Sequence, residues 1–354
     1  DTVRTGTRFL ENVVTMSKFP LEEIEDQVHA KRKIGLGLMG YHQMLLQMGV
    51  EYGSRTSLKI AERVMKRIDR VATETSHKLA TERGPFPEYS ESKWADPTEY
   101  SEWFETHAHR DPDEHAGGYP MRNHNVTTIA PTGTTSMIGD TTGGCEPIYN
   151  VAFFKNVGDD IQGDKMLVEF DDYFLKALEA NGISPDAVRE EATQKMLDNE
   201  FDGVDDLDTV PDEIGELFVT TEDLTVGEHI NVQAAFQKYC DSSISKTLNM
   251  ANDISIDAVG DAIATACQKG IKGATVYRVG SRQEEVKTTS VTGGGVTVSE
   301  SETDQLVEEL LERLGDDDID DDLRTELMGA LGLTDTTVTV QNDPVAVKTQ
   351  AQDD

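Results

Sequence analysis

Asn125-Val-Thr-Thr-Ile-Ala-Pro-Thr-Gly-Thr-Thr-Ser136 is the stretch of sequence that decides the fold. Its β-branched run, residues 126–129, predicts a strand that stops at Pro131. A turn rich in Gly and Thr follows, and Ser136 can open a helix. Backbone N–H groups converge at a helix N-terminus, the helix dipole adds partial positive charge, and hydroxyls supply further donors. The pattern predicts a loop that grips a phosphate, with an ordinary strand-to-helix turn as the alternative.

The candidate phosphate-binding residues are Pro131, Thr132, Gly133, Thr134, Thr135 and Ser136. This is not a Walker loop, because no Lys precedes the hydroxyl residues. Neutral donors suit the positioning of a phosphate better than its transfer.

A literal GxGxxG, formed by Gly35, Gly37 and Gly40, does not predict a dinucleotide site. That site requires a buried strand directly before the glycines, whereas residues 25–33 are charged and helical in pattern. The glycines also fall within an apolar helical period that runs from Ile34 to Met48. We expect them to permit close helix packing.

Apolar spacing predicts helices on both sides of the opening stretch. An entering helix within residues 1–19 has Val3, Phe9, Leu10, Val13 and Val14 on one face, and Pro20 starts a second helix. A longer helix spans about residues 57–83. Near the end, strands at 243–249 and 273–277 flank a helix from Ser255 to Gly270. A βαβ unit of this kind makes its two strands parallel.

The charge balance excludes one class of partner. Asp and Glu number 67 against 32 Lys and Arg, a formal charge of −35. Nucleic-acid binding through a basic surface is therefore not expected. The acidic excess is spread along the chain, as expected for a halophilic protein in strongly screening salt. No stretch approaches the roughly 20 apolar residues of a membrane span, so we expect a cytoplasmic protein without a membrane partner.

Cysteine and histidine positions do not predict a reactive or metal site. Cys145, Cys240 and Cys267 form no CxxC, and Cys267 falls on the apolar side of its helix, where we expect it in the core. His107, His109 and His115 invite a metal interpretation, but their spacing fits no standard ligand pair. We expect a surface loop between Glu88 and Gly118, no metal and no catalytic residue among these side chains.

Six stretches, in order, resemble the C-terminal half of the large subunit of adenosylcobalamin-dependent (class II) ribonucleotide reductase. They are residues 7–14 (TRFLENVV), 31–42 (KRKIGLGLMGYH), 82–87 (ERGPFP), 127–136 with Glu146-Pro147, 233–239 with 245–249 (QAAFQKY and SKTLN), and 272–278 with 280–282 (KGATVYR and GSR). The resemblance extends over residues 1 to about 285 and, with the acidic composition, suggests a haloarchaeal source.

The resemblance implies an α/β fold, the C-terminal part of a ten-stranded α/β barrel with helical elements. It also implies that the turn at residues 131–136 holds the phosphates of a ribonucleotide substrate. The implied chemistry replaces the ribose 2′-OH by hydrogen, through a thiyl radical that adenosylcobalamin generates and a cysteine pair that supplies reducing equivalents. The strand at residues 274–277 has a single tyrosine, Tyr277, where relatives that depend on a small subunit have two. This favours the cobalamin class.

The departures from the family concern the reactive cysteines. The family's Asn-x-Cys-x-Glu motif and its reducing cysteine pair lie upstream of the matched region, and no Cys follows Cys267. We therefore expect a chain that needs an upstream N-terminal half, separated by a gene split or intein removal, and a homodimer when complete. A non-catalytic nucleotide-binding or regulatory protein that retains a barrel remnant is the alternative.

The expected organisation is a barrel domain over 1–285, a flexible linker over 286–300 and an acidic, partly disordered tail over 301–354. The linker is predicted from its Ser/Thr/Gly composition. Two short helices, at 305–314 and 323–331, are expected in the tail.

Overall fold

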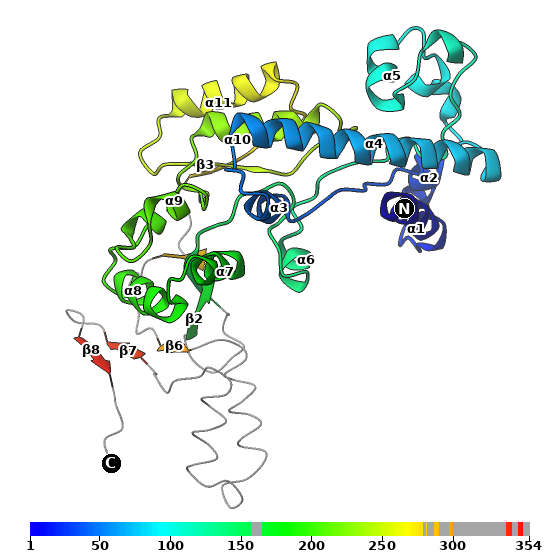
Figure 1. Ribbon diagram of the computed structural model, residues 1–354. Helices are drawn as coiled ribbons and strands as arrows, with labels where there is room; N and C mark the ends of the chain where they lie inside the picture. Colours follow the sequence, from blue (N-terminus) through cyan, green and yellow to red (C-terminus); the bar gives the residue numbers. More distant parts are fainter. Residues whose placement is uncertain are drawn as a thin grey trace, which may run out of the picture. The chain divides into compact units, whose positions relative to one another are not determined.

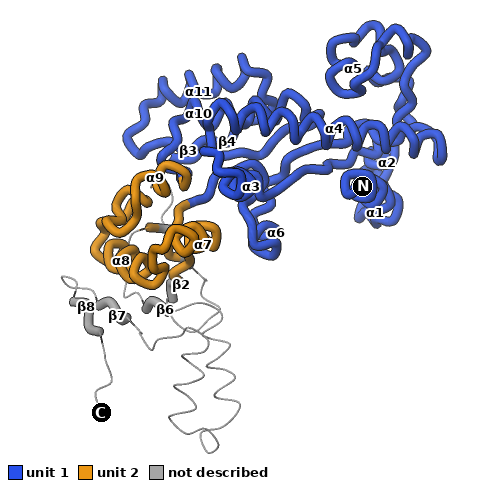
Figure 2. The backbone as a smooth tube through the Cα atoms, in the orientation of Figure 1, with its two compact units in different colours: residues 1–149, 219–281 blue, residues 150–218, 282–354 orange. Residues whose placement is uncertain are grey.

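The computed structural model describes residues 1–156, 165–278, 281 and 287–289, together with 297–299, 338–341 and 346–349. The chain forms two compact units (Figure 2). Unit 1 comprises residues 1–149 and 219–281, and unit 2 comprises residues 150–218 and 282–354.

Unit 1 contains most of the helices and one pair of strands (Figure 1). Its helices are α1 (Thr2–Met16), α2 (Glu22–Lys31), α3 (Tyr41–Gln47), α4 (Arg55–Arg83), α5 (Ser101–Ala108), α6 (Gly133–Ile138), α10 (Val226–Gln237) and α11 (Ile256–Gln268), with short 3-10 turns at Tyr89–Glu91, Lys93–Ala95 and Asp113–His115. Its strands are β3 (Thr247–Met250) and β4 (Thr275–Arg278).

Parallel extended segments form the centre of unit 1. Leu36 bridges Thr127, and Ile129 bridges Ile244, both in the parallel sense. The strands β3 and β4 pair in parallel, with Thr247 opposite Thr275, which confirms the predicted βαβ unit. Helices lie between successive segments along the chain, as parallel connections require. The α/β class is confirmed, and the described residues form an open set of parallel segments rather than a closed barrel.

The helices α1, α4 and α11 form where the apolar period predicted them. Ser54 caps α4 by accepting a hydrogen bond from the Ser57 N–H at 3.2 Å, and Thr225 with Glu228 forms a capping box at the start of α10. The helix α10 packs against α4, β3 and α11, and Figure 1 shows α10 and α11 on one side of β3. Other elements therefore cover α10 on several of its faces.

The glycine-rich stretch before α3 is extended, so the predicted helix from Ile34 is wrong. The helix begins at Tyr41, and Gly40 precedes it with φ +77°. A Cβ at Gly37 would lie 2.2 Å from the carbonyl oxygen of Thr128, and a Cβ at Gly35 would lie 2.5 Å from that residue's Cγ2. These glycines do permit close packing, but the packing is between two extended segments.

Three other predictions of burial are corrected. The segment expected as a surface loop contributes Trp94, Phe104 and His107 to the interior, where the first two pack with Phe86 and Tyr119. On α11 the buried positions are Ala262 and Ala266, whereas Cys267 is exposed. On α1, Phe9 and Val13 are exposed while Val3, Leu10 and Val14 pack inward. Apolar residues spaced around a helix need not all face one core.

Unit 2 combines a mixed sheet with small helices. The sheet has the order β5-β1-β2-β6-β7-β8, and β1 pairs antiparallel with both β2 and β5. Its strands are β1 (Ala152–Asn156), β2 (Lys165–Phe170), β5 (Lys287–Thr288), β6 (Thr297–Ser299), β7 (Val338–Gln341) and β8 (Ala346–Thr349); its helices are α7 (Asp172–Ala180), α8 (Pro185–Leu197) and α9 (Asp212–Gly215), with a 3-10 turn at Val204–Asp206.

The strands β5 and β6 lie within the segment expected as a linker, and the domain boundaries themselves stay a prediction. The helices expected at 305–314 and 323–331 lie outside the described residues. Within the part of the chain that the structure describes, no helix combines the length and the apolarity needed to cross a bilayer.

Candidate functional site

The turn at residues 131–136 joins the extended segment 126–129 to α6. The helix begins at Gly133, three residues earlier than the sequence suggested, and Thr132 precedes it with φ +51°. A left-handed conformation is an outlier for a β-branched residue and is often found at functional sites. The Thr132 hydroxyl accepts a hydrogen bond from the Gly144 N–H at 2.8 Å, which helps to hold this conformation.

Exposed donors lie at the start of α6. The first N–H groups of a helix have no acceptor inside that helix, and here they belong to Gly133, Thr134 and Thr135, which are all exposed. Ser136 is different, because it is buried and its hydroxyl donates to the carbonyl oxygen of Gly133 at 3.0 Å. The arrangement leaves backbone donors and two threonine hydroxyls available to a small anion.

A second segment, residues 141–148, wraps around the turn, and we call it the strap. The Thr141 N–H donates to the carbonyl oxygen of Ser136 at 3.0 Å. A Cβ at Gly143 would lie 2.8 Å from the carbonyl oxygen of Pro131, and one at Gly144 would lie 3.0 Å from that of Ala130. Glycine at these two positions lets the strap approach the turn closely.

Two buried side chains, Lys246 next to β3 and His229 of α10, stand behind the strap. Lys246, which is 0% exposed, lies with its Nζ 2.8 Å from Glu146 Oε2 and 2.9 Å from His229 Nδ1. The other oxygen of Glu146 accepts the Thr247 N–H at 2.7 Å. Burial lowers the pKa of His229 to about 3, with the Lys246 charge as the next cause, so its ring is neutral and Nδ1 accepts from the ammonium.

Two further hydrogen bonds fix the far end of the strap. The Tyr52 hydroxyl donates to the carbonyl oxygen of Cys145 at 2.5 Å, and the Ile148 N–H donates to His42 Nδ1 at 2.8 Å. Burial lowers the pKa of His42 to about 3, so this ring is also neutral. The strap is therefore tied to α3, α10 and β3, which positions it against the turn.

Two buried carboxylates hold the segment that leads into the turn. Asp241 accepts hydrogen bonds from the N–H groups of Val126 and Thr127 at 2.7 and 3.2 Å. Asp69 of α4 accepts from the Thr127 hydroxyl and from His107 Nδ1, both at 3.0 Å. Three segments far apart in sequence thus meet at Thr127.

Asp69→Asn is expected to remove a pH dependence of stability. Burial raises the pKa of Asp69 from its ordinary value of 3.8 to about 6. Because the native state holds this proton more tightly than the unfolded chain, the stabilisation is present below pH 3.8 and is lost as the pH rises through about 6. A shift of this size corresponds to about 3 kcal/mol.

Urea unfolding at fixed salt, followed by the fluorescence of Trp94 and Trp103, measures this effect. Both tryptophans lie in unit 1 with Asp69. The wild-type protein should lose stability relative to Asp69→Asn as the pH rises through this window. The same pH dependence in both proteins would contradict the assignment.

The cysteines of the described core are thiols without access to solvent. Cys145 and Cys240 are buried, and burial raises the pKa of each to about 12. The expectation that Cys267 lies in the core is wrong, because it is exposed. Within the described ranges, no group of three or more His, Cys, Asp or Glu side chains has a metal-binding arrangement.

The residues that hold the turn and the strap were not predicted from the sequence. One signal was available for Lys246, because Ile244, Lys246, Leu248 and Met250 alternate along one strand face and all four are buried. Asp69 likewise follows Met65 and precedes Ala72 on the buried side of α4. A charged residue at an apolar position of a regular pattern is the signal that would have found both.

This chain is similar to known ribonucleotide reductases. Residues 1–277 match the family described as the ribonucleotide reductase barrel domain. The vitamin B12-dependent ribonucleoside-diphosphate reductase of Thermoplasma acidophilum is 34% identical over 317 residues, which cover 89% of this chain and 36% of that protein. A Mycobacterium tuberculosis protein of the same name is 32% identical over 281 residues, covering 79% of this chain and 36% of that protein.

Among solved structures, the Actinobacillus ureae class Id ribonucleotide reductase alpha subunit is similar with a TM-score of 0.60. The match covers 78% of this chain and 46% of that one, at 19% identity, and so shows the fold alone. The fold and the turn define an α/β protein in which parallel segments lead into a glycine- and threonine-rich turn. The chain belongs to the ribonucleotide reductase barrel-domain family. It spans little more than a third of the length of the curated relatives.

Proposed function

We propose that this chain is the phosphate-binding, barrel-completing part of a cobalamin-dependent ribonucleotide reductase, which replaces the ribose 2′-OH of a nucleotide by hydrogen. The family match over residues 1–277 and the relatives named as vitamin B12-dependent reductases support this proposal. The observation that carries it is the exposed row of N–H donors at Gly133, Thr134 and Thr135, in a turn braced by buried side chains. In this proposal the chain supplies the C-terminal strands of a ten-stranded barrel.

The turn at residues 131–136 binds the phosphates of the substrate. Thr134 and Thr135 contribute hydroxyls, Gly133 contributes an N–H, and Pro131 and Thr132 set the path of the chain into α6. Ser136 acts from inside the turn, because its hydroxyl is engaged with Gly133. Neutral donors of this kind hold a phosphate in place and leave the reaction to other groups.

The remainder of the reductase supplies the reactive thiols. Cys145 and Cys240 are buried in the core and stay protonated at neutral pH, so neither faces a bound nucleotide. The relatives are much longer than this chain. The resemblance implies that the family's radical and reducing cysteines lie upstream of the matched region. We therefore assign the thiyl radical and the reducing pair to the upstream part of the reductase.

Neither of two hollows among the described residues suits cobalamin. They measure 390 and 240 Å³, lie on α1 and beside α9, and contain no residue of the turn. We therefore place the cofactor with the N-terminal half and derive no step through it. Its chemistry, when bound, is the generation of the radical.

The test is ribonucleotide reduction with adenosylcobalamin, assayed with and without a polypeptide that supplies the upstream half. Deoxyribonucleotide should form only when both polypeptides are present. Failure of every combination would contradict the reductase proposal. Nucleotide binding without any turnover would favour the alternative, a non-catalytic nucleotide-binding or regulatory protein.

Thr134→Val is expected to weaken the binding of a ribonucleoside diphosphate by roughly 1–3 kcal/mol, because one hydroxyl donor to a charged group is lost. Calorimetric titration with the diphosphate and with its parent nucleoside separates the phosphate contribution. The nucleoside should bind both proteins equally. An unchanged affinity for the diphosphate would contradict the proposal that this turn binds the phosphates.

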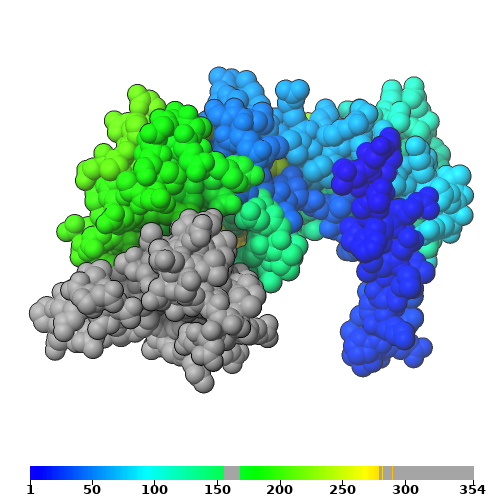
Figure 3. All heavy atoms as spheres, turned by 60° about the horizontal axis from the view of Figure 1, so that its bottom comes forward, coloured from blue at the N-terminus to red at the C-terminus, as the bar shows by residue number. Residues whose placement is uncertain are grey.

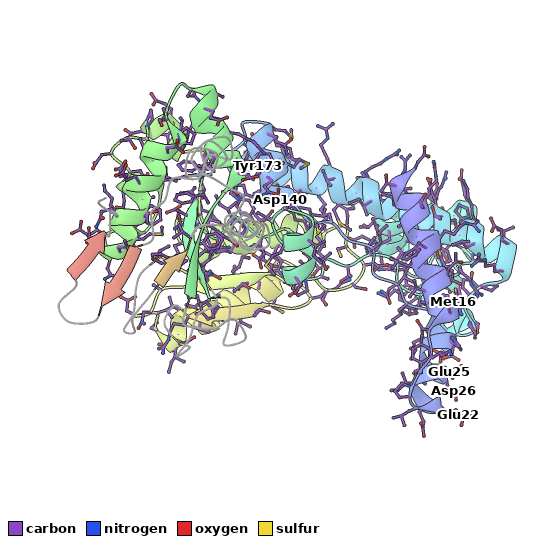
Figure 4. All side chains as sticks on the ribbon, turned by 90° about the horizontal axis from the view of Figure 1, so that it is seen from below. Met16, Glu22, Glu25, Asp26, Asp140 and Tyr173 are labelled. Atoms are coloured by element: carbon purple, nitrogen blue, oxygen red, sulfur yellow. The ribbon has the colours of Figure 1, made fainter. Side chains whose placement is uncertain are left out.

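We further propose a halophilic, cytoplasmic setting and a homodimeric complete enzyme. The acidic side chains of α2 support the first proposal, because Glu22, Glu25 and Asp26 lie together on this exposed helix (Figure 4). Such a surface repels itself at low salt and is screened at high salt. Full stability without added salt would contradict the halophilic proposal.

A further inference from the structure

The strap and the turn lie against each other, and an ion pair between Glu146 and the buried Lys246 joins the strap to β3. The turn itself has few supports of its own, because α6 is a short helix, and Met137 and Ile138 on it are exposed. In the view of Figure 1, α6 projects away from α3. The contacts that hold residues 131–136 in place come largely from the strap, through Thr141, Gly143 and Gly144.

Glu146 links the strap to β3. The Glu146 N–H donates to the carbonyl oxygen of Gly143 at 2.9 Å, so the residue closes the glycine bend directly. Its carboxylate reaches β3, where it meets the Lys246 ammonium and the Thr247 N–H at 2.8 and 2.7 Å. One side chain therefore connects the bend that touches Thr132 to the strand at the centre of unit 1.

The buried ammonium of Lys246 is the partner of the Glu146 carboxylate. Its ammonium is buried, and its remaining neighbours are the neutral ring of His229 and the carbonyl oxygen of Thr247, at 2.9 and 3.4 Å. A buried ammonium requires a charged or strongly polar partner. Glu146 supplies the negative charge, so the ion pair draws the strap against β3 in one position. Nothing in the phosphate-binding role assigned above uses either residue.

We propose that Glu146 and Lys246 are positioning residues, which set the geometry of the 131–136 turn for a phosphate by holding the strap against it. This inference rests on the proposed function. Neither side chain touches the phosphate; each acts through the glycine bend on the N–H groups and hydroxyls of the turn.

Glu146→Gln tests the proposal with the least change in shape. The amide keeps an oxygen for the Thr247 N–H but loses the charge that pairs with Lys246. Lys246→Met removes the other partner at similar length. Glu11→Gln is the matched control, because Glu11 is a buried carboxylate of unit 1 paired with Arg32 at 2.7 Å and makes no contact with the strap.

Calorimetry on the full chain, assembled with the polypeptide that supplies the upstream half, measures the affinities for ADP and for adenosine. Melting temperature is recorded for every variant. We expect Glu146→Gln and Lys246→Met to weaken ADP binding roughly tenfold, about 1.4 kcal/mol, and to leave adenosine binding unchanged. Glu11→Gln should lower the melting temperature without changing the ratio of the two affinities.

The outcomes separate this inference from the proposed function. A wild-type protein that binds ADP no better than adenosine contradicts the phosphate site itself, and the positioning role falls with it. A wild-type preference for ADP that survives in Glu146→Gln overturns the positioning role alone and leaves the site standing. If Lys246→Met does not fold, Glu146→Gln still decides, because the Glu146 side chain is 26% exposed and tolerates an amide.

Discussion

Glu11→Ala is expected to lower the free energy of unfolding of unit 1 by about 3–5 kcal/mol. Glu11 lies on α1 and is fully buried. Its carboxylate accepts hydrogen bonds from Arg32 Nη2, from Arg122 Nε and from Asn123 Nδ2, each at 2.7 Å. Removal of the carboxylate leaves two guanidinium groups without their shared counter-charge, and the Arg32 side chain is only 8% exposed.

Urea unfolding followed by tryptophan fluorescence measures this loss within unit 1. Glu82→Ala is the control, since Glu82 pairs with Arg8 at 2.7 Å on the surface, where both side chains are about half exposed. An exposed pair of this kind contributes at most about 1 kcal/mol. An equal loss of unfolding free energy in the two variants would show that the buried carboxylate contributes no more than an exposed ion pair. Figure 3 shows the first helices projecting from the rest of unit 1.

Gly37→Ala is expected to destabilise unit 1 by about 3 kcal/mol, because overpacking against backbone cannot be relieved by a change of rotamer. The added Cβ would lie 2.2 Å from the carbonyl oxygen of Thr128 and 3.3 Å from the Cα of Ile129. Both atoms belong to the segment that pairs with Ile244 and leads into the turn. The substitution must therefore push two parallel segments apart and should also weaken nucleotide binding.

Gly260→Ala provides the contrast for this prediction. Gly260 is an exposed residue in the middle of α11, and a Cβ there would meet no atom within 4 Å. Alanine should stabilise this helix by about 0.5–1 kcal/mol. Thermal and urea unfolding of both variants compare the two glycines directly. A Gly37→Ala protein as stable as the wild type would show that the parallel segments are not in close contact.

The predictions that held are those that depend on neighbouring residues. The helix α4 was predicted from its 3.6-residue period, and the parallel pairing of β3 with β4 from a strand-helix-strand order. Both patterns are local, since side chains three or four apart share a helix face and a short crossover limits how strands can pair. The turn at residues 131–136 was likewise visible from its composition.

The predictions that failed depend on contacts between distant segments. Ile34 to Gly40 has a helical apolar period, yet it is extended because it pairs with residues 125–128. His107 lies in a polar stretch, yet it is buried because Asp69, 38 residues earlier, accepts its hydrogen bond. Cys267 was placed in the core by its spacing, but small alanines are the residues of α11 that pack inward. Period alone does not reveal which face another element covers.

The sequence by itself determined the α/β class and the family resemblance, and it singled out residues 131–136 as a candidate site, because short-range spacing and ordered motifs are visible in it. The tertiary structure alone decided how that turn is held. Glu146 and Lys246 are 100 residues apart, and Asp241 meets the N–H groups of Val126 and Thr127 from more than a hundred residues away. A buried charge is stable only beside its partner, and only the folded chain brings such partners together.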